Sequence, residues 1–452
     1  PSYYLLIFLG VITVLTADIL KRGLLRPKFT QRVYLSLLVS FVLILIPFFI
    51  FDYALAIVIS ELFAFVSLFI GFFATSFISE HVKVREINEA KRKLDSMDMI
   101  KIAVTGSYGK TSTKEFIRQL LSSKFKIKAT PKGENTIFAL VRSIASLEED
   151  CEVFVAEMGA YKRGEIHEMA RILKPDIGVI SGIGVQHVSL FGSDENLKGA
   201  KFELVKDINS AGVAIFNLDS AGARDLFERA KIERRDLKLI GYSLKAKGKN
   251  KLKTKIVRVE RDGVVVEVKQ KGKSHMLKTN LRGKHFVYNL LAAIIVAHRL
   301  GVGWKDIEKA STDLTLPEGI MSVQKVANAI VIDDTRNTSE AGFLSALDYL
   351  SLFEKERKVV VTPGIIELGK KAKKVHERLA NAMAGDIDRL VVTNDNYYPV
   401  FKSTVENTQL IKDAGKLKEV IEEEVGKEKC VILLEGRLTG GILKLVREKS
   451  KG

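Results

Sequence analysis

The chain has 452 residues, of which 47% are hydrophobic and 28% are charged, and its formal net charge is +17. This length and composition allow two or three domains with hydrophobic cores, and they exclude an intrinsically disordered or fibrous protein. The two cysteines, Cys151 and Cys430, are too few for a disulfide framework or a zinc site, so we expect buried thiols in a reducing compartment.

Three apolar stretches occupy the first 80 residues. They cover residues 2–20, where Asp18 is the only charge, residues 33–51, which carry no charge, and residues 53–78, where Glu61 is the only charge. Each has close to the roughly 20 residues that a helix needs to cross a hydrocarbon core. A cleaved signal peptide would explain one such stretch but not three. We therefore expect residues 1–80 to form a membrane anchor of about three transmembrane helices, since core helices of globular domains are seldom so uniformly apolar.

Basic residues beside the apolar stretches predict their orientation. Five lie between the first and second stretches: Lys21, Arg22, Arg26, Lys28 and Arg32. Such clusters stay in the cytoplasm, and residues 81–98 add a basic juxtamembrane linker that anionic lipid headgroups would favour. The sequence thus predicts a multi-pass protein of the inner (cytoplasmic) cell membrane, with its later domains in the cytoplasm. Glu61 is either a functional carboxylate at membrane depth or a protonated group bonded to a neighbouring helix.

From residue 99 onward, strand-like and helix-like patterns alternate, which is typical of an α/β fold built on mostly parallel sheets. One series ends near Pro317 and a second follows, so we expect a central domain at residues 99–316 and a Rossmann-like C-terminal domain at residues 317–452. Residues 251–279 differ, because an Asp262-Gly263 turn joins two β-branched runs and predicts a hairpin. Alternating lysines in its first arm are interpreted first as a solvated, edge-protecting face and second as a binding stripe.

The first strand of the central series runs into a glycine-rich loop and reads IKIAVTGSYGKTST from residue 100. Gly106 and Gly109 would let backbone N–H groups converge on an anion, and a helix beginning at Lys110 adds its positive end. Lys110 supplies a cation for phosphates, and the Thr111 hydroxyl is a possible Mg²⁺ ligand. The general motif G-x-x-x-x-G-K-[ST] lacks its first glycine here, so the loop alone favours nucleotide binding and a plain glycine-rich turn equally.

Six later segments complete an ordered pattern. They are VFVAEMGA at 153–160, QHVSLFGS at 186–193, GAKFELV at 199–205, GKHFVYNLLAAIIVA at 283–297, VIDDTRNTSEA at 331–341 and TPGIIELGKKAKKVH at 362–376. With the short loop TGSxGKT, this order resembles the Mur ligase family over residues 99–452, and the last segment most resembles its D-alanyl-D-alanine-adding, or MurF, type. The resemblance implies an α/β fold with a P-loop-type central ATPase domain, and an ATP-dependent, ADP-forming ligase.

The resemblance also implies a catalytic and metal-binding set. Lys110 would neutralise the transferred phosphoryl group, Thr111 and Glu157 would bind magnesium, and His187 would bind a second magnesium ion. Lys201 would be carbamylated by CO₂ and so become an anionic metal ligand. The residues implied for nucleotide binding are Gly106, Ser107, Gly109, Lys110, Thr111, Ser112, Asn289, Asp334 and Arg336. Singly, each has an ordinary structural explanation, and only their joint order favours a site.

The implied reaction joins a carboxylate to an amine. ATP would first convert the carboxylate to an acyl phosphate, and the amine would then displace phosphate. The acid would be a muramoyl-peptide precursor of the cell wall, either soluble or lipid-linked, and the amine would be D-Ala-D-Ala or a similar amino acid or dipeptide. Membrane lipids are expected partners. Nucleic acid is not, because the basic residues cluster beside the apolar stretches and on the hairpin rather than among aromatics.

Three departures from the family pattern leave the acceptor open. Ile320 stands where the family has an arginine that contacts the terminal phosphate, and Arg336 is our hypothesis for its replacement. Glu435 stands where the family has a lysine, and apolar stretches stand in place of the usual N-terminal domain. Two alternatives follow: a membrane-bound poly-γ-glutamate ligase of the CapB/PgsB type, and a catalytically inactive, membrane-tethered nucleotide-binding scaffold. Retention of the implied catalytic residues argues against the scaffold.

Overall fold

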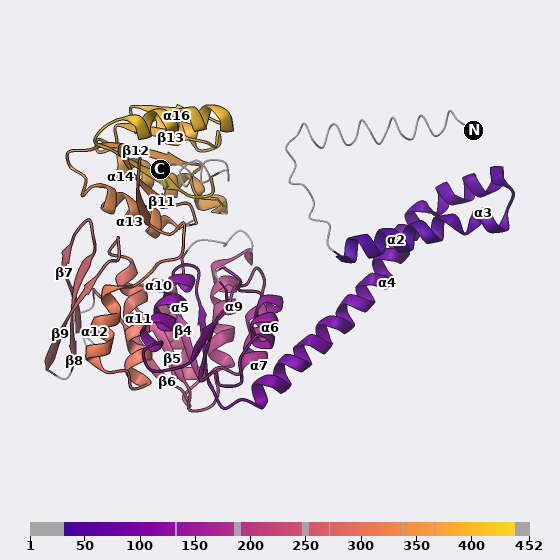
Figure 1. Ribbon diagram of the computed structural model, residues 1–452, viewed down its shortest axis with the longest axis horizontal. Helices are drawn as coiled ribbons and strands as arrows, with labels where there is room; N and C mark the ends of the chain where they lie inside the picture. The colour runs from indigo at the N-terminus through magenta and orange to yellow at the C-terminus, as the bar shows by residue number, and fades with distance from the viewer. Residues whose placement is uncertain are drawn as a thin grey trace. The chain divides into compact units, whose positions relative to one another are not determined.

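The computed structural model describes residues 31–131, 133–184, 191–245, 253–270, 272–336, 339–366 and 368–438. The chain divides into two compact units, residues 1–89 and residues 90–452. The described part of the first unit is helical, and the second holds three sheets with their covering helices (Figure 1).

Two long helices and a short one make up the described part of the first unit, from residue 31 onward. They are α2 (Gln31–Leu45), α3 (Pro47–Ile50) and α4 (Tyr53–Asp95), the last of which continues into the second unit. Small side chains lie where α2 and α4 cross: the hydroxyls of Ser36 and Thr75 are 2.7 Å apart, and the Ser40 hydroxyl donates to the Ser67 carbonyl at 3.0 Å. A Cβ atom on Gly71 would lie 2.6 Å from the Ser40 Oγ, so glycine is required for this close packing.

The predicted multi-pass membrane localisation is wrong. Among the described residues, a single stretch, Val33–Ile50, is long and apolar enough to cross a membrane. The apolar stretch at residues 2–20 lies outside the described residues. The stretch at 53–78 is the first part of α4, a 43-residue helix that becomes highly charged toward Asp95. The prediction relied on the length of the apolar stretches, but core helices and signal sequences can have similar length. The predicted orientation depended on the same membrane assignment, so it is wrong as well.

Six parallel strands form the first sheet of the second unit, which confirms the expected α/β architecture. Their order is β2-β3-β1-β4-β5-β6. The strands are β1 (Ile100–Thr105), β2 (Ile127–Ala129), β3 (Val153–Glu157), β4 (Ile177–Ile180), β5 (Val213–Asn217) and β6 (Lys238–Tyr242). The central strands are short apolar runs buried on both faces. Since β3 and β4 flank β1 on opposite sides, their carboxyl ends border the kind of crevice in which α/β sheets bind ligands.

Seven helices of the described region accompany this sheet (Figure 1). They are α5 (Lys110–Leu121), α6 (Ile137–Ala145), α7 (Glu165–Leu173), α9 (Asp194–Lys206), α10 (Ala221–Glu233), α11 (Phe286–Arg299) and α12 (Trp304–Thr312). α11 is apolar on nearly all sides because it is buried along most of its length. It packs against α5, where the rings of Phe116 and Phe286 meet edge to face at 6.5 Å. This contact fixes α11 beside the glycine-rich loop that precedes α5.

A three-stranded antiparallel sheet follows, and it confirms the predicted hairpin. β7 (Lys253–Val259) and β8 (Val264–Gln270) flank the Asp262-Gly263 turn, and a third strand, β9 (Lys273–Thr279), pairs with β8.

The second six-stranded sheet has the order β10-β11-β15-β12-β13-β14, with only β10 antiparallel to its neighbour. Its strands are β10 (Ser322–Val326), β11 (Ala329–Asp334), β12 (Arg357–Thr362), β13 (Arg389–Val392), β14 (Thr408–Leu410) and β15 (Cys430–Glu435). Its helices are α13 (Glu340–Leu350), η1 (Gly369–Lys371), α14 (Ala372–Met383), α15 (Tyr398–Lys402) and α16 (Ala414–Gly426). The parallel core of this sheet agrees with the predicted Rossmann-like series. Cys151 and Cys430 are both free and buried, as expected.

Candidate active site

The glycine-rich loop after β1 is shaped by two glycines in conformations that other residues rarely adopt. Gly106 has φ +152° and Gly109 has φ +76°. Between them, the Ser107 N–H donates to the Gly182 carbonyl at 2.7 Å and so ties the loop to the segment after β4. A Cβ on Gly109 would lie 2.5 Å from the Asn289 Oδ1. The loop therefore has room for glycine alone at the start of α5.

Lys110 begins α5 and turns back over the loop, where its Nζ donates to the Ser107 carbonyl at 3.3 Å. Burial lowers the pKa of Lys110, and the negative charge of Glu157 opposes that shift. The Ser107 hydroxyl is buried and has no hydrogen-bond partner among the described residues. Thr111 is half-buried and Ser112 is buried in the first turn of the helix. A cation and an unpartnered hydroxyl at a helix N-terminus suit a phosphate group.

Glu157 ends β3 beside Val104 of the central strand, and its side chain is buried. Its Oε1 accepts a hydrogen bond from the Asn135 amide at 3.1 Å, while its Oε2 is buried without a hydrogen-bond partner among the described residues. A buried carboxylate oxygen without a donor suits a hard cation such as Mg²⁺. Within the described ranges no group of three or more His, Cys, Asp or Glu side chains forms a metal site. His187, the implied ligand of a second magnesium ion, lies outside those ranges.

Lys201 is 3% exposed on α9, and its ammonium lies 5.9 Å from the centre of the Phe191 ring. Burial lowers the pKa of Lys201 to about 7, and the nearby charge of Lys110 lowers it further, against the influence of Glu203 and Glu165. At neutral pH much of this amine is therefore uncharged and nucleophilic, unlike an exposed lysine.

Asn289 is 6% exposed on α11, and the structure brings it to the glycine-rich loop. Its Oδ1 accepts a hydrogen bond from the Thr113 hydroxyl at 3.3 Å and faces Gly109. Asn289 is thus placed beside the start of α5 rather than acting as a helix cap. Glu157 ends β3, while Lys110, Lys201 and Asn289 come from the helices α5, α9 and α11.

Asp334 and Arg336 lie instead at the carboxyl end of β11, in the second sheet. Asp334 is fully buried, accepts a hydrogen bond from the Met321 N–H at 2.9 Å, and lies opposite Glu435 in the strand register. Arg336 is exposed, and its N–H donates to the Gly319 carbonyl at 2.9 Å. A Cβ on Gly319 would lie 3.0 Å from the Arg336 Cγ, so this arginine packs against the residue that precedes Ile320.

Two residues of the site were missed from the sequence, the buried Lys114 and the partly buried Asn135. The Lys114 Nζ donates to the carbonyls of Thr130 at 2.5 Å and Pro131 at 3.2 Å, and it lies 3.9 Å from the Glu157 Oε2. The position of Lys114, one helical turn after Lys110, was an available signal. Asn135 lies in a loop without regular structure, and nothing in its neighbourhood marks it.

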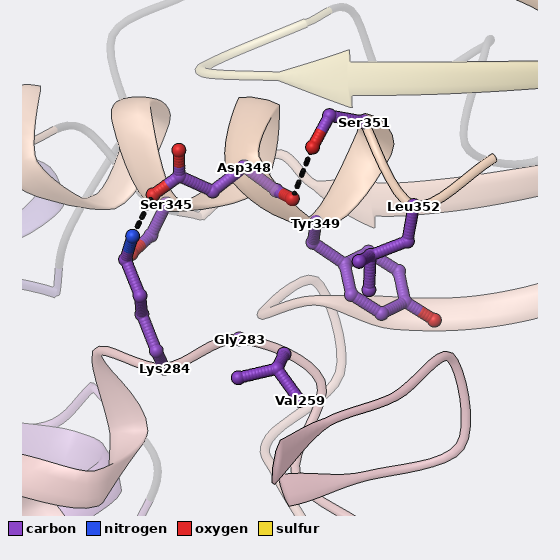
Figure 2. A pocket seen from close by; sticks show the side chains of 8 residues that line it. All are labelled: Val259, Gly283, Lys284, Ser345, Asp348, Tyr349, Ser351 and Leu352. Atoms are coloured by element: carbon purple, nitrogen blue, oxygen red, sulfur yellow. Dashed lines mark hydrogen bonds and ion pairs between the residues drawn. The ribbon is translucent and has the colours of Figure 1, made fainter. Parts of the chain in front are cut away.

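A cavity of about 230 Å³ lies elsewhere in the second unit, between the end of β7, the loop before α11 and α13 (Figure 2). An ion pair between Lys284 and Asp348, 2.6 Å long, crosses it. The remaining lining residues are Val259, Gly283, Ser345, Tyr349, Ser351 and Leu352. None of the residues implied for catalysis or nucleotide binding lines this cavity.

Comparisons with known proteins agree with this geometry. Residues 104–297 match the family model of the Mur ligase middle domain. This segment is similar to the Mur ligase middle domain. It contains the glycine-rich loop, Glu157, Lys201 and Asn289, so all four features belong to one recognised domain. The names of the curated relatives support an ATP-dependent ligase enzyme of the Mur type.

Curated relatives extend the similarity beyond this domain. The UDP-N-acetylmuramoyl-tripeptide–D-alanyl-D-alanine ligase of Rickettsia prowazekii is 28% identical over 316 residues, which cover 67% of this chain and 68% of the relative. The enzyme of the same name from Synechocystis is 30% identical over 297 residues, covering 65% and 62%. The chain thus spans only about two thirds of the length of these relatives.

Solved structures show the same fold. MurF from Acinetobacter baumannii has a TM-score of 0.72 at 22% identity, covering 82% of this chain and 81% of that one. MurF from Thermotoga maritima in complex with ADP has a TM-score of 0.69 at 23% identity, covering 82% and 84%. At these identities the likeness establishes the fold alone.

Proposed function

We propose that the protein catalyses ATP-dependent amide-bond formation, adding D-Ala-D-Ala or a similar amine to a muramoyl-peptide in cell-wall synthesis. The observation that carries the proposal is the meeting of Lys110, Glu157 and Lys201 around the glycine-rich loop of a segment similar to the Mur ligase middle domain. The names of the curated relatives supply the substrate class.

The proposed reaction has two steps. A substrate carboxylate oxygen attacks the γ-phosphorus of ATP, the bond to the bridging oxygen breaks, and ADP leaves. The amine nitrogen then attacks the acyl carbon, phosphate leaves with the electron pair of the acyl–oxygen bond, and the amine loses a proton. Lys110 and the N-terminus of α5 hold the transferred group, because both present positive charge to it. Magnesium would bind at Thr111 and at the Glu157 Oε2, which has no hydrogen-bond partner among the described residues, and it would supply further positive charge there.

Lys201 is proposed to react with CO₂. Its neutral amine would attack the carbon of CO₂ and release one proton, which leaves a carbamate with an anionic oxygen. The lowered pKa supports this, because only the uncharged amine is nucleophilic. Carbon-13 NMR of protein equilibrated with ¹³C-bicarbonate should show a carbamate signal that Lys201→Met lacks. A signal that persists in the variant would contradict the assignment.

The nucleotide is proposed to lie between residues 99–316 and residues 317–452. Gly106, Ser107, Gly109 and Ser112 would surround the phosphates, and Asn289 would approach the base. Asp334 and Arg336 would reach the nucleotide from the second sheet. The position of Arg336 beside Gly319 supports the idea that it replaces the arginine missing at Ile320.

An ADP-release screen tests the proposed reaction. The purified chain would be given ATP and Mg²⁺ with UDP-MurNAc-tripeptide or glutamate oligomers, each paired with D-Ala-D-Ala or glutamate. We expect ADP only when the muramoyl-peptide and D-Ala-D-Ala are both present, and little with Lys110→Met. ADP release that requires glutamate oligomers would instead indicate the poly-γ-glutamate ligase.

A further inference from the structure

Lys114 is a fully buried lysine whose contacts all belong to one small region. Its Nζ donates to the backbone carbonyls of Thr130 and Pro131, at 2.5 and 3.2 Å. The same nitrogen lies 3.4 Å from Glu115 and 3.9 Å from the Glu157 Oε2. A buried ammonium needs such partners, so Lys114 joins α5 to the segment that follows β2.

That segment in turn holds Glu157. The Thr130 hydroxyl accepts the Glu157 N–H at 3.0 Å, and the Thr130 N–H donates to the Val155 carbonyl at 3.0 Å. Farther along, the Asn135 amide donates to the Glu157 Oε1 at 3.1 Å. The Asn135 carbonyl accepts the Gly159 N–H at 2.8 Å. The backbone and the side chain of Glu157 are therefore both hydrogen-bonded to the segment that Lys114 contacts.

A buried lysine can also be a plain structural ion pair, and the same unit contains one. Lys358 on β12 is 7% exposed and pairs with Asp386, and neither contacts a residue implied for catalysis. Lys114 differs because it donates to the Thr130 and Pro131 carbonyls, in the segment whose Thr130 also binds Glu157. Of the two Glu157 oxygens, only Oε1 receives a hydrogen bond from the described residues.

We propose that Lys114 is a positioning residue for Glu157. By holding Thr130 and Pro131, it keeps Asn135 on one carboxylate oxygen and leaves the other, Oε2, facing a divalent cation. The inference rests on the proposed function, because that function gives Glu157 its metal. Lys114 itself touches neither substrate nor metal in this role.

Manganese binding tests the inference without turnover. Mn²⁺ would be titrated into the full chain with a non-hydrolysable ATP analogue, and free Mn²⁺ would be followed by electron paramagnetic resonance. We expect Lys114→Met to weaken Mn²⁺ binding about tenfold or more, since loss of groups that orient a metal ligand has effects of this size. Lys358→Met is the matched control: it removes a buried lysine ion pair and should leave Mn²⁺ affinity unchanged.

A role through charge alone and a role in positioning Glu157 predict opposite effects of Lys114→Met on Mn²⁺ binding. A lysine that acted only through its charge would repel the metal, so its removal would tighten Mn²⁺ binding. Tighter or unchanged binding would therefore overturn the proposal. A wild-type chain that binds no Mn²⁺ with the nucleotide analogue would overturn the proposed function, and the role of Lys114 with it.

A second comparison separates positioning from general loss of stability. If Lys114 and Asn135 act on the same carboxylate, the double variant Lys114→Met with Asn135→Ala should weaken Mn²⁺ binding no more than the stronger single variant. Independent effects would multiply, and that result would show that Lys114 does not act through the Asn135 contact.

Discussion

At the scale of single residues, two buried glutamates, Glu424 on α16 and Glu435 on β15, have opposite environments. Glu424 on α16 is surrounded by cations: Arg389 Nη1 lies 2.7 Å from one of its oxygens, Lys427 lies 2.9 Å away, and Arg357 lies 3.2 Å away. Burial opposes ionisation, but hydrogen bonds to these cations outweigh it and lower the pKa of Glu424 to about 2. This carboxylate therefore stabilises the fold while it is ionised.

Glu424→Gln is expected to lower the free energy of unfolding at pH 7 by about 2–3 kcal/mol, because the cations lose their counter-charge. The wild-type advantage should be complete above about pH 5 and should shrink as the pH falls from 4.5 toward 2. Urea unfolding of the wild type and of Glu424→Gln between pH 3 and pH 7 measures this difference in the free energy of unfolding. A stability difference that stays constant from pH 3 to pH 7 would show that ionised Glu424 does not stabilise the fold.

Glu435 lies at the end of β15 opposite Asp334, with its Oε2 buried and without a hydrogen-bond partner among the described residues. Burial, followed by the adjacent Asp334 carboxyl, raises the pKa of Glu435 well above its usual range. The folded state therefore disfavours the ionised carboxylate, which lowers the stability at neutral pH relative to acid pH. Glu435→Gln should therefore raise the free energy of unfolding at pH 7 and have little effect below pH 4. Equal stability at pH 7 would contradict the raised pKa.

Arg336 is the residue proposed to replace the arginine missing at Ile320. Arg336→Ala should lower kcat/KM for ATP by about tenfold or more, since a charge at the transferred phosphate acts mainly on the transition state. Lys255→Ala, at an exposed position on β7, is the control and should have little effect. A variant with near-normal turnover would leave Ile320 without a functional substitute.

Residue roles were only partly predictable from the sequence. Lys110, Glu157 and Asn289 were singled out by motif order, and the structure gathers them. Lys114 looked like one of 71 basic residues, because nothing local in a sequence reports that a helix face is fully buried. The role of Asn135 could not be predicted for another reason. Asn135 and Glu157 are 22 positions apart, and their contact depends on how the chain between them folds.

At the scale of elements, the glycine-rich loop makes the sharpest prediction. Gly109→Ala should weaken binding of an ATP analogue by about tenfold or more, because a Cβ there meets Asn289 at 2.5 Å. Gly133→Ala is a matched control: its φ of +72° resembles the +76° of Gly109, yet a Cβ there meets nothing within 4 Å. Calorimetric titration of both variants separates backbone strain from the clash, and equal losses would refute the clash.

Prediction of elements succeeded where the apolar runs were unbroken and buried. The apolar runs EVFVAEM, DIGVIS, AIVIDD and CVILLEG became β3, β4, β11 and β15, all parallel and buried. Two edge strands escaped prediction, because β2 has three residues and the antiparallel β10 shows no clear alternation.

At the scale of the whole molecule, composition misjudged the first unit. Apolar length in three stretches suggested a multi-pass anchor, but the described residues offer one candidate span.

In the second unit, the small sheet contacts α13 and the loop after it through Arg261. This guanidinium forms two hydrogen bonds with Glu356, at 2.8 and 3.0 Å, and lies over the Phe353 ring.

Arg261→Ala should therefore loosen the second sheet from the small sheet. We expect calorimetry to resolve two thermal transitions where the wild type shows one, because the contact couples the unfolding of both parts. Lys284→Ala removes the half-exposed ion pair with Asp348 and should preserve a single transition, since such pairs contribute about 0–1 kcal/mol. One unchanged transition in Arg261→Ala would show that the coupling lies elsewhere.

The contact between Thr113 and Asn289 has a consequence for how the protein is made. These residues are 176 positions apart, so the loop after β1 emerges from the ribosome long before α11 can pack against it. Such distant pairing delays folding, because the intervening chain must first be ordered. A nascent chain that ends before residue 289 carries the complete loop sequence but lacks its packing partner. The nucleotide pocket is therefore completed only after α11 has been synthesised, although its loop is translated well before that helix.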